Sequence, residues 1–142
     1  MIESTVVDNL RADGTIADIV STYSTRTSTV PAVFSDQAPE DAEKPYIVVT
    51  VASYPVPDYA IDAFDIFVHY YERGESGAKA RAVAREIEII FDGHNFDSDW
   101  YTTIRFYRRH GTFAAEADPL ERHYIKQLYA RASRKGWMEQ LP

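Results

Sequence analysis

The chain contains no cysteine among its 142 residues, which excludes disulfide bonds, thiolate nucleophiles and metal sites built on cysteine ligands. It also lacks a long apolar run, since no stretch approaches the roughly 20 residues needed to span a bilayer. The amino terminus, Met1–Glu3, has neither a basic segment nor an apolar signal core. We therefore expect a soluble protein that needs no oxidising compartment and no membrane.

Glycine is scarce as well, and the signatures of catalytic sites are missing. The six glycines are dispersed, so no glycine-rich phosphate loop is present, and no Gly-x-Ser-x-Gly elbow occurs. The four histidines show no paired metal-ligand spacing. The loop 92–99 is the best metal candidate because it is rich in oxygen ligands, but the order of its residues differs from that of a calcium loop. We favour a helix stop followed by a polar loop, which explains the same residues. We predict a protein that is not an enzyme, with no catalytic residue, cofactor or metal.

The composition is that of a globular domain, with 45% hydrophobic and 26% charged residues. The net charge is −7, but it is unevenly spread along the chain. Residues 1–99 hold 18 acidic and 7 basic side chains, whereas residues 100–142 hold 4 acidic and 8 basic ones. Such a gradient suits head-to-tail contact between copies or docking on an acidic partner. Charges scattered over the surface by chance would produce the same numbers.

Helical and extended patterns alternate along the chain. Apolar residues recur at helical spacing from Ile2 to Leu10. The clearest helix is 78–91, which has an apolar stripe and ends at Asp92-Gly93. Runs of β-branched and aromatic residues predict strands over 32–35, 46–53, 63–71, 100–112 and 124–132.

This order predicts an α+β fold. We expect a mainly antiparallel four- to five-stranded sheet, with an N-terminal helix and one long amphipathic helix packed on one face. One domain would cover residues 1–132, and residues 133–142 would form a C-terminal tail.

The expected loop 54–59, which follows the predicted strand 46–53, combines two stiff prolines with two tyrosines. Its two prolines prevent the preceding strand from continuing, and proline lowers the entropy lost when a loop docks. These features favour a contact loop, although a hairpin connector fits the same residues. The interface candidates of this loop are Tyr54, Pro55, Val56, Pro57, Asp58 and Tyr59.

A second candidate surface lies in the last third, where 105–110 mixes cations with aromatic rings. Strand alternation would place Arg105, Tyr107 and Arg109 on one face. Such a mixture is typical of single-stranded nucleic-acid platforms and of protein interfaces, and it also fits a half-solvated strand. We favour protein contact, and the interface candidates here are Arg105, Arg108, Arg109 and, near the C-terminus, Trp137.

The layout resembles the tail-terminator, or tail-completion, proteins of long-tailed bacteriophages. The resemblance covers roughly 2–132, and its specific parts are Val33–Pro39, the proline-tyrosine-led strand Lys44–Val51, and the helix Ala78–Gly93 that ends before a polar loop. None of these parts is a catalytic signature, so the likeness lies in order and spacing. Residues 137–142 extend past the usual end of the pattern.

The resemblance implies a function that composition alone does not. Such proteins form a ring, usually of six subunits, that caps the tail tube, ends its polymerisation and presents a docking surface to the head. The implied partners are further copies of the chain, the tail-tube protein and a head-completion or connector protein, while DNA passes through the lumen without specific binding. The implied location is the head–tail joint of a virion assembled in the host cytoplasm. Alternatives are a stopper or neck protein of similar fold, and a small ligand- or nucleic-acid-binding module. The ligand-binding alternative predicts a pocket built from His69, Arg105 and nearby tyrosines.

Overall fold

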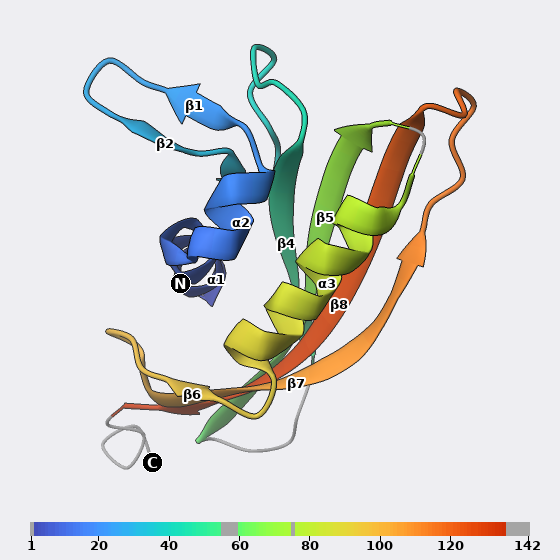
Figure 1. The fold of residues 1–142 in the computed structure, drawn as a ribbon. Coiled ribbons are helices and arrows are strands. Elements are labelled where there is room, and N and C mark those ends of the chain that lie inside the picture. The colour runs from blue at the N-terminus through green and yellow to red at the C-terminus, as the bar shows by residue number, and fades with distance from the viewer. Residues whose placement is uncertain (1, 55–59, 75, 136–142) are drawn as a thin grey trace.

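A computed structural model describes residues 2–54, 60–74 and 76–135 of the chain (Figure 1). Its elements follow one another in the order α1 (Ile2–Ala12), α2 (Gly14–Ile19), β1 (Thr22–Ser24), β2 (Thr29–Pro31), β3 (Val33–Ser35), β4 (Tyr46–Tyr54), β5 (Ile61–Arg73), α3 (Ala78–Phe91), β6 (Asn95–Phe96), β7 (Tyr101–Phe113) and β8 (Glu121–Arg134). Within these ranges, no helix is long and apolar enough to cross a membrane.

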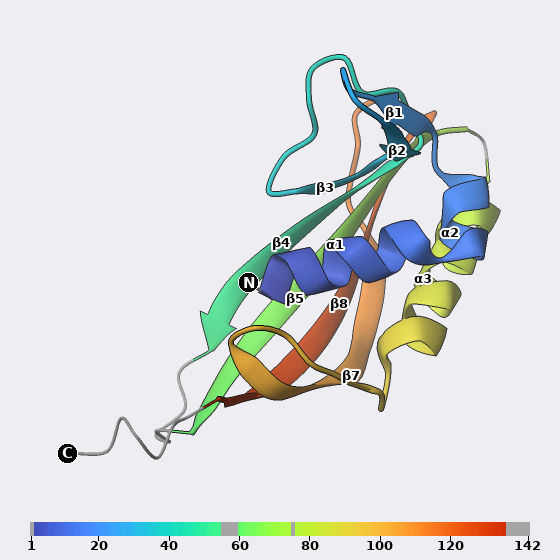
Figure 2. The ribbon, with the colours of Figure 1, turned by 90° about the vertical axis from the view of Figure 1, so that its left-hand side faces the viewer.

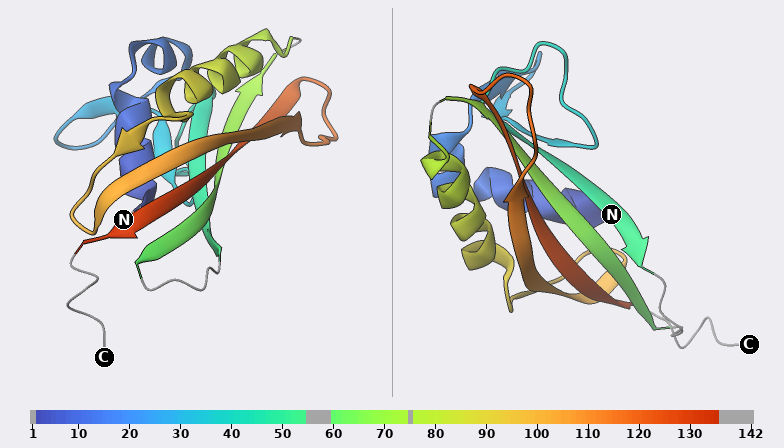
Figure 3. Two further views of the ribbon diagram at one scale, coloured as in Figure 1. Left: turned by 90° about the horizontal axis from the view of Figure 1, so that it is seen from below. Right: turned by 90° about the vertical axis from the view of Figure 1, so that its right-hand side faces the viewer.

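Six strands form one sheet in the order β3-β4-β5-β8-β7-β6. β3 and β4 run parallel, and the other neighbouring pairs run antiparallel. β5 and β8 form the centre and pair along the whole of β5, from Ile61 opposite Ser133 to Arg73 opposite Glu121. Strands this long twist strongly, so the sheet curls, as Figure 3 shows. β1 and β2 form a separate two-stranded sheet that stands away from the main one.

The helices lie on one face of the main sheet (Figure 2). Successive side chains of a strand point to opposite faces, so Ile66 and Val68 of β5 point toward the helices while Phe67 and His69 point away. Apolar side chains of α1, α3 and the inner sheet face fill the space between the two layers. The fully buried large side chains include Leu10, Ile16, Ile47, Ile66, Tyr70, Ile87, Phe91, Ile104, Phe106 and Leu128.

α3 is the helix that the sequence predicts over 78–91, and its bounds are confirmed. At its start the backbone N–H of Ala78 donates to the Ser76 hydroxyl over 3.2 Å. Its end is set by Gly93, whose φ of 72° lies in the left-handed region that favours glycine.

The predicted fold class is wrong. The structure is mostly β, since 47% of the described residues lie in strands and 24% in helices. Its six-stranded mixed sheet replaces the expected mainly antiparallel sheet of four to five strands with one long helix. The mixed character arises because the loop 36–45 carries the chain back to the start of β3, so β4 runs in the same direction as β3. β1, β2 and β6 add three further short strands. Strands of two or three residues are too short to show a period.

The division of the chain into a domain and a tail stays a prediction. β8 continues through Arg134, past the expected boundary at residue 132. The last residues of the expected tail, 136–142, lie outside the described residues.

Candidate functional site on the sheet face opposite the helices

The sheet face turned away from the helices, here called the outer face, carries large side chains that are only partly buried. Strand alternation and register bring them together: Phe67 of β5 lies opposite Gln127 of β8, and Tyr71 lies opposite His123. Figure 3 shows this face without a helical layer over it. Tyrosine, phenylalanine and arginine are enriched where proteins contact one another. The half-buried or exposed aromatic and basic members of this face are Tyr46, Phe67, His69, Tyr71, Arg105, Tyr107, His123, Tyr129 and Arg131.

A continuous row of rings crosses the outer face from the β1–β2 hairpin to the centre of the sheet. Tyr23 meets Phe34 edge-on at 5.2 Å between ring centroids, and Tyr46 lies 5.2 Å from Tyr71. Tyr71 then stacks on His123 at 4.2 Å. Edge-on and offset contacts at these distances are favourable, so the row gives this face a fixed apolar surface.

Two histidines sit at the inner end of this row. The Nδ1 atom of His69 lies 2.9 Å from Nε2 of His123, and Nε2 of His69 lies 3.2 Å from the Thr50 hydroxyl. Burial lowers the pKa of both histidines, and the neighbouring His123 lowers the pKa of His69 further. Glu116, whose carboxylate is 3.8 Å from Nδ1 of His123, acts in the opposite direction on the pKa of His123. Both rings are therefore mainly neutral at pH 7.

Five side chains of β7 and β8 form a second cluster on the outer face, here called the basic patch: Arg105, Tyr107, Arg109, Tyr129 and Arg131. The guanidinium of Arg109 lies 5.1 Å from the centre of the Tyr129 ring, and that of Arg105 lies 5.8 Å from the Tyr107 ring. All three arginines are exposed. In the described part of the chain, none of them forms an ion pair with a carboxylate. The patch is thus a cationic surface with aromatic rings held beneath the charges.

The structure brings together some of the predicted interface residues and separates others. Arg105 and Arg109 lie in the basic patch with Tyr107. Arg108 instead pairs with the inner-facing Leu128, and its backbone N–H donates to the Asp92 carboxylate over 2.8 Å. Tyr54 is the last residue of β4. The remaining candidates, Pro55, Val56, Pro57, Asp58, Tyr59 and Trp137, lie outside the described residues.

The sequence did not single out Tyr129 and Arg131 of β8, because strand pairing cannot be deduced from one chain. Trp100 was not among the predicted interface residues either. It is 68% exposed, and tryptophan is enriched at protein interfaces. The signal that could have found the two β8 residues is the alternation of Gln127, Tyr129 and Arg131, which places these three side chains on one face of the predicted strand 124–132.

The ligand-binding alternative required a pocket built from His69, Arg105 and nearby tyrosines. The sheet keeps the first two apart: His69 pairs with Ile125, whereas Arg105 pairs with Arg131. Along β8 the rise of 3.3 Å per residue separates Ile125 from Arg131 by about 20 Å. His69 and Arg105 therefore do not converge on one ligand.

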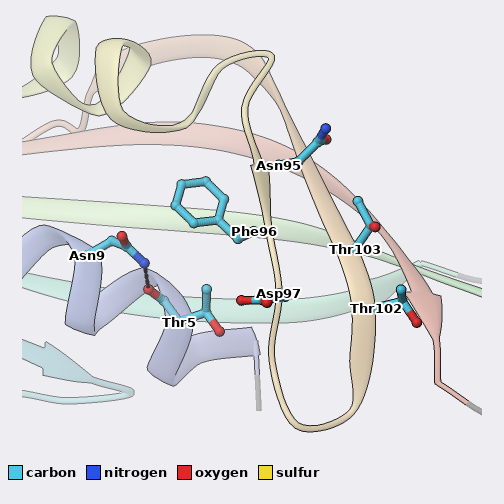
Figure 4. A pocket seen from close by; sticks show the side chains of 7 residues that line it. All are labelled: Thr5, Asn9, Asn95, Phe96, Asp97, Thr102 and Thr103. Carbon is cyan, nitrogen blue, oxygen red and sulfur yellow. Dashed lines mark hydrogen bonds between the residues drawn. The ribbon is translucent and has the colours of Figure 1, made fainter.

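Two open grooves flank α1 on the helix side of the molecule. One has a volume of about 560 Å³ and lies between α1 and the β6–β7 end; Figure 4 shows its polar lining, in which Asn9 donates to the Thr5 carbonyl over 2.8 Å. The residues that line it are Thr5, Asn9, Asn95, Phe96, Asp97, Thr102 and Thr103.

The second groove, here called the acidic groove, measures about 550 Å³ and lies between α1 and β3. Its charged lining residues are Glu3, Asp8, Arg11 and Asp36. The guanidinium of Arg11 donates to the Val33 carbonyl over 3.0 and 2.6 Å. Arg11 therefore binds the backbone of β3 and not a carboxylate of the groove. Within the described residues, Glu3, Asp8 and Asp36 form no ion pair.

In the structure, the loop 92–99, which was the best metal candidate from the sequence, ends α3 and leads toward β7. The Asp92 carboxylate accepts the Arg108 N–H, and Nδ1 of His94 lies 2.9 Å from the Ile90 carbonyl at the end of α3. The first contact joins the end of α3 to β7, and the second holds the loop against the last turn of α3. Among the residues that the structure describes, no group of three or more histidine, aspartate or glutamate side chains is arranged to hold a metal ion.

No protein-family model and no curated protein matches the chain. Its fold, however, is similar to that of solved structures. One is a chain of the virion of the native gene transfer agent particle, with a TM-score of 0.69 and 19% identity over 93% of this chain and 94% of that chain. Another solved chain gives a TM-score of 0.63 and 13% identity over 92% of this chain and 89% of that chain. At these identities the likeness shows a shared fold over nearly the whole chain.

Proposed function

We propose that the chain is a structural protein of a virion that forms a ring on the end of a tail tube. The ring ends tube polymerisation and provides the docking surface for the head. The observation that carries this proposal is the fold shared with a chain of the gene transfer agent virion over 93% of this chain. The resemblance of the sequence to phage tail terminators supports the finer assignment to the tail end.

The surfaces of the molecule support a role in assembly. A subunit of a closed ring needs two different lateral patches, because each copy contacts one neighbour with one side and the next neighbour with the other. It also needs axial surfaces for the tube and the head. The outer face offers a row of half-buried rings, and the basic patch and the acidic groove lie near opposite ends of the strand order.

The proposed partners are further copies of this chain, expected in a ring of six, together with the tail-tube protein and a head-completion or connector protein. DNA would pass through the lumen without specific binding, since a net charge of −7 disfavours a general hold on phosphates. The proposal assigns the chain no catalytic step, cofactor or metal. Its place is the head–tail joint of a virion assembled in the host cytoplasm.

The test is a capping experiment with the tail-tube protein of the same particle. Tube protein is polymerised with and without the purified chain, tube lengths are measured by electron microscopy, and the mass of the chain is measured by mass photometry. We expect shorter tubes with a ring at one end and a chain species near six times the monomer mass, alone or on tubes. The variant Val83→Asp, altered at a side chain that is 1% exposed, serves as the unfolded control.

A chain that stays monomeric or dimeric and leaves tube length unchanged would contradict the proposal. Binding to head connectors without any effect on tubes would instead support the stopper or neck alternative.

A further inference from the structure

Two separate surfaces of the sheet carry opposite charge. The acidic groove lies beside β3, the first strand of the order, and the basic patch lies on β8 and β7 toward the other end. β4 and β5 separate the two regions. One copy therefore presents anionic and cationic surfaces near different edges of the same sheet.

The basic patch holds like charges against one another. Arg105 and Arg131 are direct cross-strand partners in the register of β7 and β8. Like charges in directly opposite positions destabilise a sheet, and neither guanidinium forms an ion pair with a carboxylate within the described residues. The hydrogen bond of Arg105 goes to the neutral amide of Asn95, over 3.3 Å. A carboxylate brought from outside would remove this repulsion and can accept two parallel N–H bonds from one arginine.

The acidic groove holds carboxylates that are close to one another and complement the charge of the basic patch. Glu3, Asp8 and Asp36 line one concavity, while the Arg11 guanidinium donates to the backbone of β3. Since α1 packs beside β3 and Arg11 occupies the Val33 carbonyl, this edge is poorly suited to accept another strand. A partner would therefore contact this edge through side chains and not through strand pairing, and cationic side chains would complement the carboxylates of the groove.

We propose that the basic patch of one copy seats on the acidic groove of the next copy. This inference rests on the proposed function, in which copies of the chain assemble, and it names the lateral contact. The two surfaces differ, so the contact is heterologous and closes into a ring when the rotation per copy allows it. An ionic contact of this kind weakens as salt screens the charges.

The cysteine-free sequence permits a direct test by cross-linking. Two single variants, Asp8→Cys and Arg131→Cys, are mixed and treated with a short bismaleimide. We expect a cross-linked dimer in the mixture and only background in either variant alone, because the contact joins unlike surfaces. Lys79→Cys, at an exposed position of α3, replaces Asp8→Cys as the matched control and should give background with Arg131→Cys. Equal cross-linking with the control would overturn the assignment.

Charge reversal provides a second, independent test of the same contact. Arg105→Glu with Arg131→Glu, or Glu3→Lys with Asp8→Lys, should weaken assembly of the chain at least 10-fold in mass photometry and sedimentation. Asp36 is left unchanged because its φ of 68° disfavours most replacements. The chain carrying all four substitutions should recover assembly. A mixture of the two double variants should recover it as well, because alternating copies join oppositely charged surfaces at every contact, whereas neither double variant does so alone. Lys79→Glu with Arg85→Glu, on the exposed side of α3, is the control that keeps assembly.

The outcomes separate this inference from the proposed function. If the unaltered chain assembles and the reversed variants assemble equally well, the contact is wrong and the ring proposal stands. If the unaltered chain assembles neither alone nor on tubes, the proposed function itself fails. Tight, salt-sensitive binding of short single-stranded DNA that Arg105→Glu with Arg131→Glu abolishes, with assembly intact, would make the basic patch a nucleic-acid surface and overturn the contact.

Discussion

His69 and His123 face each other across β5 and β8 with 2.9 Å between Nδ1 of the first ring and Nε2 of the second. A hydrogen bond at this distance needs one nitrogen to donate and the other to accept, so it forms only while at least one ring is neutral. Burial lowers the pKa of both histidines and thereby favours this neutral state. The groups that face the pair are the Thr50 hydroxyl, the stacked Tyr71 ring and the Glu116 carboxylate.

The histidine pair predicts that stability falls in mild acid. The pKa of each ring is lowered in the folded state relative to about 6.5 in an unfolded chain. The unfolded state therefore binds more protons in this range, so the free energy of unfolding decreases as pH falls through about 6.5 toward the lowered pKa values. We expect His123→Gln, which can keep a polar group near the position of Nε2, to show a shallower loss between pH 7.5 and 5 in thermal unfolding. His110→Gln, at an exposed position of β7, is the control; identical slopes for all three proteins would refute the assignment.

The buried ammonium of Lys126 predicts an unequal effect of removing its partners. Its Nζ atom donates to the Glu88 carboxylate over 2.6 Å and to the Arg109 carbonyl over 2.5 Å, and the lysine side chain is 5% exposed. Glu88→Ala leaves a buried charge without its counter-ion and should lower the free energy of unfolding by roughly 2 to 4 kcal/mol. Lys126→Met removes the charge and keeps most of the volume, so it should cost less. Chemical denaturation of the two variants measures the order, and a larger loss for Lys126→Met would contradict it.

Two glycines predict stability changes of opposite sign. A Cβ atom on Gly111, beside the irregular register of β7, would overlap the hydroxyl of Tyr124, whose ring packs edge-on against Phe113 at 4.9 Å. Gly111→Ala should therefore destabilise the fold by about 1 to 3 kcal/mol through overpacking. A Cβ atom on Gly14 would meet nothing within 4 Å, and this residue starts α2. Gly14→Ala should leave stability unchanged or raise it by up to about 1 kcal/mol. Melting temperatures that move the same way for both variants would contradict the argument.

The sequence was informative where the signal is local. The stripe of α3 and the long extended runs show their period within a single segment, so α3 is found with its bounds and the predicted strand 63–71 lies within β5. β1, β2 and β6 are too short to show such a period. β3 lies within the predicted strand 32–35, but its direction relative to β4 depends on where the loop 36–45 returns the chain. For this reason the fold class was predicted wrongly although its longest helix was not.

The candidate surfaces could be predicted only in part, because they depend on pairing between distant segments. Arg105 and Arg109 were named from the composition of one strand, but their cross-strand neighbours Tyr129 and Arg131 come from the next one. His69 and His123 are 54 residues apart in the chain, and neither has a motif around it. Sequence spacing does not indicate such contacts, which require the register of β5 with β8.

The packing of α3 predicts which of two isoleucines can accept a charge. Ile87 is fully buried against the inner sheet face, whereas Ile89, on the same helix, is 55% exposed. Ile87→Asp places a carboxylate in an apolar interior without a partner, which should cost several kcal/mol and unfold a domain of ordinary stability. Ile89→Asp adds the same charge in water and should change the free energy of unfolding by less than about 1 kcal/mol. Because the two variants share composition, charge and helix propensity, any difference between their melting temperatures reports burial alone. Equal melting temperatures would show that α3 does not pack on the sheet with this face.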